Sequence, residues 1–247
     1  MSNILEVKDI NKSFGSIVAA KALNVSVRKG ERLGLIGTNG AGKTTFVNIV
    51  TGYIKPETGA VLLEGENITG HTPRSITRAG VCRSFQVPQL FLTLTAIENL
   101  VTALGIANGD AFSPTARLDG PLEREADELL KRFRLQDYRD QVVSELPGGV
   151  RKLIDIAVAV TRKPRLLLLD EPTSGVAAEQ KFALMDIVMS ALDESVTTMF
   201  VEHDMDIVAR YAQRVLAFYD GRIIADGPPA QVLADEAVKN HITGSAN

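Results

Sequence analysis

The chain has 247 residues, of which 45% are hydrophobic and 23% are charged, and its formal net charge at pH 7 is −3. This length and composition predict one large domain, or one domain carrying a subdomain, with a substantial core. The small negative charge excludes a general basic field for nucleic-acid binding, although a local basic patch stays compatible with it. Cys82 is the single cysteine, which excludes an internal disulfide and favours a small apolar core residue.

No apolar run approaches the ~20 residues that a membrane-spanning helix needs. The first residues, Met1–Glu6, lack both the charged segment and the long apolar segment of a secretory signal. We therefore expect a cytoplasmic chain, unless a partner holds it at a membrane.

The N-terminal part predicts short strands around a glycine-rich loop. Strands are expected at Leu5–Ile10, Val25–Val27, Arg32–Ile36 and Ala60–Leu63, and a helix is expected at Lys43–Thr51. The order of strand, loop and helix from Arg32 to Thr51 is the order that a phosphate-binding loop requires.

Residues 37–45, with the sequence GTNGAGKTT, match the phosphate-binding pattern G-x-x-x-x-G-K-[ST] at every specified position. Glycines let backbone N–H groups approach a phosphate chain without Cβ clashes. Lys43 is expected to reach the β- and γ-phosphates of a nucleotide, and Thr44 to bind Mg²⁺ through its hydroxyl. The alternative, a chance glycine-rich turn, is disfavoured by the strand before it and the helix after it. The loop residues expected to bind the nucleotide are Gly37, Asn39, Gly40, Ala41, Gly42, Lys43, Thr44 and Thr45.

The middle of the chain changes to helix-forming residues. An amphipathic helix is expected at Glu123–Phe133, after a loop at Gly105–Gly120 that is rich in glycine, aspartate, serine and proline. A core helix is expected at Arg151–Arg162, ending before Pro164. Its apolar face is formed by Leu153, Ile156, Ala157 and Val160. We interpret the segment as a helical insertion.

Two apolar runs end in polar residues. Arg165–Leu169 is followed by Asp170-Glu171, and Thr197–Val201 is followed by Glu202-His203-Asp204. Such runs are typical of strands buried on both faces of a parallel sheet, at whose carboxyl ends ligands bind. Asp170 is therefore expected to orient Mg²⁺ through water, Glu171 to polarise the attacking water, and His203 to sense the γ-phosphate. The alternatives are a solvated acidic turn and an ordinary surface histidine.

The C-terminal part predicts a hairpin with a tight turn at Asp220-Gly221. One short helix and a frayed end are expected after Pro229.

With these motifs in order, the chain resembles the nucleotide-binding subunit of ATP-binding-cassette transporters over nearly all of residues 4–242. The resemblance implies an α/β fold: a P-loop NTPase core with a mixed or parallel sheet, an N-terminal antiparallel β subdomain and an inserted α-helical subdomain. It implies a single domain over residues 1–247, with the helical subdomain at approximately 87–162. ATP and Mg²⁺ are the implied cofactors.

The resemblance also assigns residues one by one. Phe14 occupies the position of the aromatic that stacks on adenine, and Gln86 matches the glutamine that meets Mg²⁺ and water. Gly148 and Gly149 match part of the signature loop, which binds the nucleotide of a partner cassette. Asp170, Glu171 and His203 match the remaining positions, so that Thr44, Gln86 and Asp170 form the implied metal set.

The segment Val201–Met205, the helical stretch after Gln86 and the hairpin Tyr219–Arg222 look most like the subfamily that serves branched-chain amino-acid uptake. This implies import of branched-chain or related amino acids, or of small amides, at the cytoplasmic face of the inner membrane. The implied partners are transmembrane permease subunits, a second cassette and, in the whole complex, a substrate-binding protein, but no nucleic acid. The apolar residues after Gln86, from Val87 to Leu92, fit a groove for a permease helix.

The chain departs from the family pattern in two places. Where Leu-Ser-Gly-Gly-Gln is expected, the chain has Leu146-Pro147-Gly148-Gly149-Val150, and Ala177 replaces an acidic or amide residue. Pro147 has neither the serine hydroxyl nor a backbone N–H, and each lost charge-assisted hydrogen bond removes ~1.5–3 kcal/mol. Because this loop serves the partner's ATP, we expect a heterodimer with an intact second cassette. A homodimer, with these residues as tolerated variation, stays open.

Three other functions share the phosphate loop. A soluble cassette ATPase of DNA repair or translation usually has two cassettes or a long coiled coil, and the chain has neither. A nucleotide kinase does not explain Gln86, Gly148-Gly149 and His203 together. A regulatory module that binds ATP with little turnover fits the altered signature loop, but the presence of Glu171 argues against it.

Overall fold

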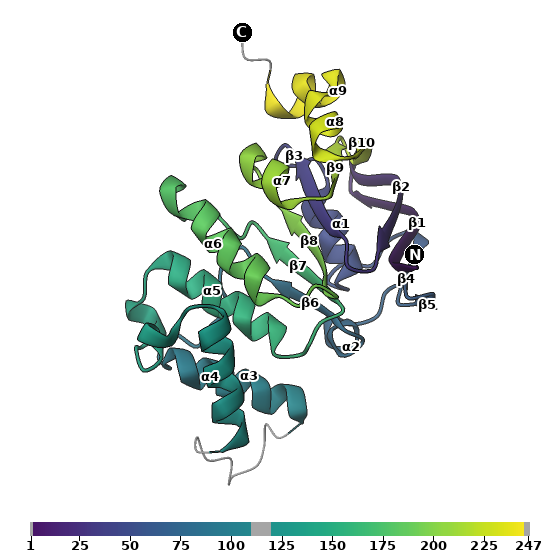
Figure 1. Cartoon of the computed structure of the whole chain (residues 1–247). Helices are drawn as coiled ribbons and strands as arrows, with labels where there is room; N and C mark the ends of the chain where they lie inside the picture. Colours follow the sequence, from purple (N-terminus) through teal and green to yellow (C-terminus); the bar gives the residue numbers. More distant parts are fainter. Residues whose placement is uncertain (1, 110–119, 245–247) are drawn as a thin grey trace. The chain divides into compact units, whose positions relative to one another are not determined.

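The computed structural model of the chain describes residues 2–109 and 120–244. The chain divides into two compact units. The first unit contains Met1–Cys82, Arg165–Leu168 and Glu194–Asn247, and the second contains Arg83–Pro164 and Leu169–Asp193. Figure 1 labels the strands and α-helices and colours the chain along its sequence.

A four-stranded antiparallel sheet lies in the first unit, in the order β2-β1-β4-β5. Its strands are β1 (Asn3–Phe14), β2 (Ile17–Arg28), β4 (Thr58–Leu63) and β5 (Glu66–Asn67). β1 and β2 form a hairpin whose turn is Gly15-Ser16 (Figure 1). Both strands are longer than the sequence predicted, because exposed polar residues interrupt their apolar pattern while the backbone pairing continues.

The second sheet is six-stranded and mixed, in the order β10-β9-β3-β8-β7-β6. Its strands are β3 (Arg32–Gly37), β6 (Val81–Ser84), β7 (Leu166–Asp170), β8 (Thr197–Val201), β9 (Arg214–Tyr219) and β10 (Arg222–Gly227). β3 pairs in parallel with β8 and β9, whereas β9 and β10 form an antiparallel hairpin. β7 and β8 are buried at every position, as their unbroken apolar runs predicted.

The tight turn of the β9–β10 hairpin is confirmed. Asp220 and Gly221 have φ values of 47° and 69°. Two consecutive left-handed residues are typical of the two-residue turns that join twisted antiparallel strands. The predicted Asp-Gly turn therefore has the backbone conformation that its residues favour.

The first unit contains α1 (Lys43–Val50), α2 (Pro73–Arg78), α7 (Met205–Tyr211), α8 (Pro229–Ala234), α9 (Glu236–Val238) and the π-helix η3 (Lys239–Thr243). The prediction of one short C-terminal helix was wrong. Asp235 has an extended backbone that ends α8, and its carboxylate accepts hydrogen bonds from the backbone N–H groups of Ala237 and Val238, which begins α9.

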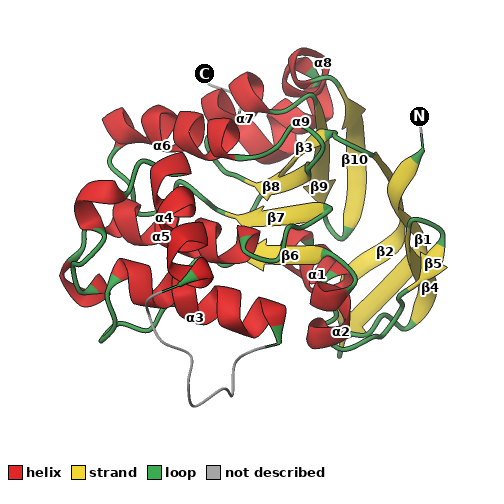
Figure 2. Cartoon of the chain, turned by 60° about the horizontal axis from the view of Figure 1, so that its bottom comes forward, coloured by secondary structure: helices red, strands yellow, loops and turns green. Residues whose placement is uncertain are grey.

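The second unit contains α3 (Ala96–Asn108), α4 (Pro121–Arg132), η1 (Gln136–Tyr138), η2 (Val143–Glu145), α5 (Gly148–Val160) and α6 (Ala178–Ala191) (Figure 2). α3 passes through Gly105, where a loop was predicted, and ends at the left-handed Gly109. A capping box between Thr95 and Glu98 begins this helix. Most of the predicted loop, residues 110–119, lies outside the described residues.

α5 is buried on more than the predicted face. Leu153, Ile156, Ala157 and Val160 are all buried, which confirms the core face. Ile154, Lys152 and Asp155 are buried as well, and the helix begins at Gly148, three residues before the predicted start. α5 contacts α3 and α6. It is therefore a central helix of the second unit, and it places two charged side chains in that unit's interior.

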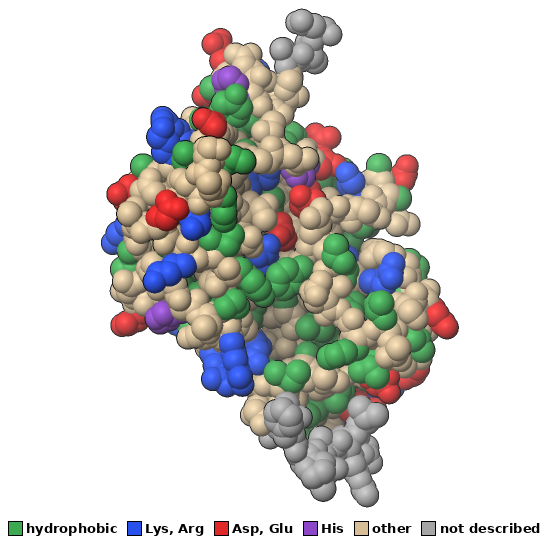
Figure 3. All heavy atoms as spheres, turned by 180° about the vertical axis from the view of Figure 1, so that it is seen from behind, with side chains coloured by type: hydrophobic (Ala, Val, Ile, Leu, Met, Phe, Trp, Pro, Cys, Tyr) green, Lys and Arg blue, Asp and Glu red, His purple; other side chains and the backbone are tan. Residues whose placement is uncertain are grey.

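The surface carries charges of both signs. On the face drawn in Figure 3, acidic and basic side chains are interspersed with hydrophobic ones, in agreement with the net charge of −3. Cys82 is buried, as expected of an apolar core residue. Among the residues that the structure describes, no helix combines the length and the apolar character needed to cross a membrane.

Candidate functional site

The glycine-rich loop connects β3 to α1 in the first unit. Gly37, Gly40 and Gly42 have φ values of 152°, 80° and 105°. A Cβ atom on Gly37 would lie 2.5 Å from the carbonyl oxygen of Phe218, and one on Gly42 would lie 2.5 Å from that of Ala19. Gly37 and Gly42 are thus required for two reasons: their backbones pack closely against β9 and β2, and their positive φ values favour glycine.

The loop ends at the amino terminus of α1, where a phosphate group can be bound. Its first turn, Lys43-Thr44-Thr45, contains no acidic residue that would repel an anion. Lys43 is 5% exposed, and its Nζ donates hydrogen bonds to the carbonyl oxygens of Gly37, at 2.5 Å, and Thr38, at 3.0 Å. The ammonium group is therefore held beside the loop backbone. The side chain of Thr44 is exposed.

The structure brings His203 to the same sheet edge as this loop. β3 and β8 are parallel neighbours, with Leu35 paired to Val201. Glu202 and His203 follow β8 directly, so they lie at the carboxyl edge where the loop leaves β3. His203 is exposed, and its backbone N–H donates to the carboxylate of the buried Glu202 at 3.2 Å. An imidazole at this edge can donate a hydrogen bond to an anion.

Phe14 lies at the end of β1, and its side chain is 47% exposed. The Nζ of Lys12 lies 5.3 Å from the ring centroid. The following strand of the hairpin, β2, contains Ala19, whose carbonyl packs against Gly42. The hairpin that packs on the phosphate loop thus carries a half-exposed aromatic ring, the type of side chain that can stack on a base.

Gln86 and Glu171, both in the second unit, are in direct contact. Gln86 Nε2 donates to Glu171 Oε2 at 2.8 Å. Glu171 follows β7 and has a φ of 46°, a left-handed conformation that costs a residue with a Cβ roughly 1–2 kcal/mol. Such strain concentrates at functional sites, where surrounding contacts enforce it. The two residues predicted to act on water are therefore brought together.

Asp170 is paired with a residue that the sequence reasoning missed. Arg83 Nη2 lies 2.5 Å from Asp170 Oδ2, and both side chains are largely buried. The guanidinium also lies over the ring of Phe85, 4.8 Å from its centroid. Arg83 lies three residues before Gln86 in the same short segment, but its sequence context gave no signal of a partner 87 positions away.

Lys152 and Asp155 were also missed. Asp155 is 4% exposed, and its carboxylate accepts hydrogen bonds from Ser84 Oγ at 2.6 Å and from the backbone N–H of Gln89 at 2.9 Å. Burial raises the pKa of Asp155 above its ordinary value, and these hydrogen bonds oppose the rise. The available signal was a lysine and an aspartate three positions apart on a helix that is otherwise mostly apolar.

The signature loop ends at the start of α5. Pro147 precedes the first helical residue, Gly148, and both are exposed. The carbonyl of Pro147 accepts the backbone N–H of Arg151 at 3.0 Å. Gly148 and Gly149 thus place their N–H groups at the positive end of a 13-residue helix, which suits an anion. Ala177 directly precedes α6.

The residues proposed for Mg²⁺ offer a hydroxyl from Thr44, an amide carbonyl from Gln86 and a carboxylate from Asp170. These are hard oxygen donors, the type that Mg²⁺ prefers alongside phosphate oxygens and water. One oxygen of Asp170 is engaged by Arg83, which suits a carboxylate that orients the metal's water molecules. The donor chemistry of this set therefore fits Mg²⁺.

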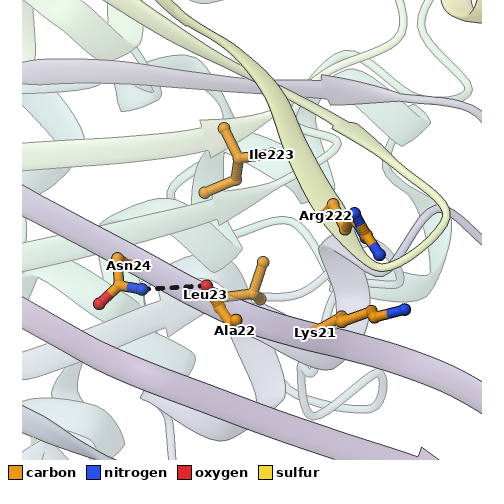
Figure 4. Close-up of a pocket in the computed structure, with 6 residues that line it drawn as sticks. All are labelled: Lys21, Ala22, Leu23, Asn24, Arg222 and Ile223. Atoms are coloured by element: carbon orange, nitrogen blue, oxygen red, sulfur yellow. Dashed lines mark hydrogen bonds between the residues drawn. The ribbon is translucent and has the colours of Figure 1, made fainter.

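A separate pocket of about 480 Å³ lies in the first unit (Figure 4). Its lining comes from β2 and β10: Lys21, Ala22, Leu23, Asn24, Arg222 and Ile223. Asn24 Nδ2 donates to the carbonyl of Ala22 at 3.0 Å within it. None of these six lining residues was predicted to bind the nucleotide.

Comparison with known proteins supports the motif analysis. The family model described as ABC transporter matches residues 20–174. The chain is 32% identical to the probable branched-chain amino acid transport ATP-binding protein LivG of Archaeoglobus fulgidus, over 95% of this chain and 93% of that protein. It is 33% identical to the high-affinity branched-chain amino acid transport ATP-binding protein BraF of Pseudomonas aeruginosa, over 98% of each.

Solved structures agree with this result. The ADP conformation of MJ1267, an ATP-binding cassette of an ABC transporter, superposes with a TM-score of 0.85 at 30% identity, over 97% of this chain and 98% of that one. The cassette cbiO1 from Clostridium perfringens superposes with a TM-score of 0.81 at 27% identity, over 97% and 94%. These likenesses confirm the predicted α/β fold class, a P-loop NTPase core with additional β and helical parts.

We predict that Gly42→Ala damages the phosphate loop more than Gly40→Ala. Both substitutions strain a left-handed residue by roughly 1–2 kcal/mol, but only the first adds a Cβ that meets Ala19, an overpacking cost of about 1–3 kcal/mol more. Gly40 is the matched control, because an added Cβ there meets no described atom within 4 Å. Urea unfolding and titration with a fluorescent ATP analogue measure both effects. Equal losses in the two variants would contradict the packing argument.

A second prediction concerns pH. Because the folded state raises the pKa of Asp155 above 3.8, it binds the proton more tightly than the unfolded state does. The stability that this protonation contributes is lost as the pH rises through the folded pKa. Asp155→Asn does not titrate, so the free energy of unfolding of the wild type should fall relative to that of the variant as the pH rises above 3.8. Urea unfolding at a series of pH values tests this, and a constant difference would refute it.

Proposed function

Because this chain belongs to the ABC transporter family, as an ATP-binding and ATP-hydrolysing subunit, we propose that it powers the import of branched-chain or related amino acids, or of small amides. The relatives that support this substrate class include the branched-chain amino acid transport ATP-binding protein LivG of Escherichia coli strain K12, 32% identical over 98% of each chain. The coupling of hydrolysis to transport rests on the contact between Gln86 and Glu171, which joins the predicted hydrolytic carboxylate to the segment predicted to meet the permease.

We assign the roles in hydrolysis as follows. The phosphate loop and Lys43 bind the β- and γ-phosphates, Phe14 stacks on adenine, and His203 contacts the γ-phosphate. Glu171 accepts a proton from the attacking water, whose oxygen bonds to the γ-phosphorus as the bond to the bridging oxygen breaks. Thr44, Gln86 and Asp170 hold Mg²⁺, which when bound supplies charge neutralisation for the phosphates. The products are ADP and phosphate.

The permease contact is proposed at the apolar segment after Gln86. Val87, Phe91 and Leu92 are 69%, 57% and 51% exposed. Three large apolar side chains exposed within six residues are unusual outside an interaction surface. Transmembrane permease subunits are the proposed partners, with a substrate-binding protein in the whole complex. We propose that these partners hold the chain at the cytoplasmic face of the inner membrane.

A heterodimer with a different cassette is the proposed assembly. The start of α5 keeps the N–H groups of Gly148 and Gly149, whereas Pro147 and Val150 lack the side-chain donors of the expected serine and glutamine. A partner with an intact signature loop would complete the site built on this chain's phosphate loop. The second candidate, a cassette that binds ATP with little turnover, is favoured by the same two residues.

ATP hydrolysis by the purified chain, measured over a range of protein concentrations, tests the proposed function. We expect slow hydrolysis by the chain alone, because a homodimer would place Pro147 and Val150 in both sites, whereas a fast rate that rises more than linearly with concentration would favour a homodimer. Glu171→Gln should lower kcat by about 100-fold or more, since it removes the proton acceptor. ATP binding without turnover in the wild type, with the partner cassette present, would support the regulatory candidate instead.

Restoring the signature loop tests the heterodimer. The double variant Pro147→Ser, Val150→Gln should raise the ATPase rate of the chain alone by about tenfold or more for each recovered hydrogen bond that acts in the transition state, since each is worth ~1.5–3 kcal/mol and ~1.4 kcal/mol equals tenfold. The same variant in a Glu171→Gln background is the control for contaminating ATPases. An unchanged rate would show that Pro147 and Val150 are tolerated variation in a homodimer.

A further inference from the structure

We propose that Lys152 is a positioning residue that holds Gln86 against Glu171, and that Asp155 is its partner on α5. This role rests on the proposed ATPase function, because it acts on the residue pair assigned to hydrolysis. Neither residue belongs to a nucleotide-binding motif. All the residues that carry the argument lie in the second unit.

Lys152 is 2% exposed, and its ammonium group contacts the backbone on both sides of the hydrolytic pair. Nζ donates to the carbonyl oxygens of Phe85 at 2.6 Å, Gln86 at 3.1 Å and Asp170 at 3.2 Å. A lysine ammonium has three N–H donors, so these acceptors match its capacity. Asp170 directly precedes Glu171. One side chain therefore binds the backbone at Gln86 and the backbone adjoining Glu171.

Asp155 holds the same segment at two further points. Its carboxylate binds Ser84 Oγ at 2.6 Å and the backbone N–H of Gln89 at 2.9 Å. With the bonds from Lys152 to Phe85 and Gln86, α5 holds four of the six residues from Ser84 to Gln89. The side chain of Gln86 is exposed, but its backbone is fixed from the buried side. Its side chain bonds to Glu171 at 2.8 Å, and Lys152 holds the backbone at Gln86 and at Asp170, next to Glu171.

Lys152 and Asp155 are oppositely charged, which explains how both can be buried in this unit. A buried ammonium or carboxylate is costly unless it is hydrogen-bonded and compensated. Lys152 and Asp155 lie three residues apart on one helix, a spacing that brings side chains to the same face. The positive charge of Lys152 favours the ionised form of Asp155. Each charge thus compensates the other while it binds a different part of the 84–89 segment.

Lys152 lies close to the start of α5. α5 begins at Gly148, and Lys152 lies four residues later, about one helical turn or 6 Å along the axis. The helical turn that holds Gln86 therefore lies directly after the signature loop.

The test compares Lys152→Met, Lys152→Arg and Arg139→Met with the wild type, in the full chain. Methionine keeps the length and apolar stem of lysine but donates no hydrogen bonds, whereas arginine restores several donors. Arg139 is the matched structural control: it binds carboxylates of Glu123, Asp127 and Asp140 at the surface of the same unit. Its loss should lower stability without touching the hydrolytic pair. Two quantities are measured: amide hydrogen exchange without nucleotide, and kcat and KM for ATP.

We expect Lys152→Met to raise amide exchange in residues 84–89 and 171–174 by about tenfold and to lower kcat by about tenfold, with KM changed less than about threefold. Lys152→Arg should recover most of both effects. Arg139→Met should leave kcat and the exchange of these two segments unchanged, even at an equal loss of stability.

Three results would overturn the proposal: unchanged exchange and kcat in Lys152→Met, no recovery in Lys152→Arg, or an equal fall of kcat in Arg139→Met. Failure of the proposed function is distinguishable from these. A wild-type chain that does not hydrolyse ATP, even with its partner cassette, refutes that function, whereas the exchange measurement still decides whether Lys152 holds the two segments.

Discussion

Close backbone packing around the phosphate loop is the constraint on which the first unit's site depends. The carbonyls of Phe218 and Ala19 occupy the space where side chains at Gly37 and Gly42 would lie. The loop can therefore be curled only if those positions are glycine, and only a curled loop directs its N–H groups and the start of α1 toward one anion. The strands that press on the loop, β2 and β9, come from opposite ends of the chain. Anion binding at the loop thus depends on the assembly of both sheets.

The second unit positions its functional residues by a different principle. Arg83, Lys152 and Asp155 are charged groups in a largely buried environment, and each is tied to a segment that carries a proposed functional residue. Burial strengthens these interactions and makes their loss costly, which favours a unique arrangement. In the first unit, glycines without side chains allow the phosphate loop to curl. In the second unit, buried charged side chains hold Gln86, Asp170 and Glu171 in place.

These two principles suit an ATPase that is coupled to a membrane partner. Phosphate binding requires a rigid cradle, and β3 and α1 provide it. The proposed water activation and permease contact require residues that respond to one another. Gln86 is bonded to Glu171 and directly precedes an exposed apolar segment. α5 connects this pair to the altered signature loop. Pro147 thus lies directly before, and Val150 within, the helix that also positions the proposed catalytic residues.

The sequence by itself determined the phosphate loop, the buried strands β7 and β8, the Asp220-Gly221 turn and the family, because each depends on residue types at short, fixed spacing. It did not reveal the full lengths of β1 and β2, the burial of α5 beyond its predicted face, or the division of the segment after Pro228 into α8, α9 and η3. Only the tertiary structure decided the partners of Arg83, Lys152 and Asp155, which lie 87, 66 and 71 positions away along the chain. The physical reason is that a buried charged side chain needs hydrogen-bond or ionic partners in place of water. The folded chain, not the local sequence, decides which groups lie close enough to be those partners.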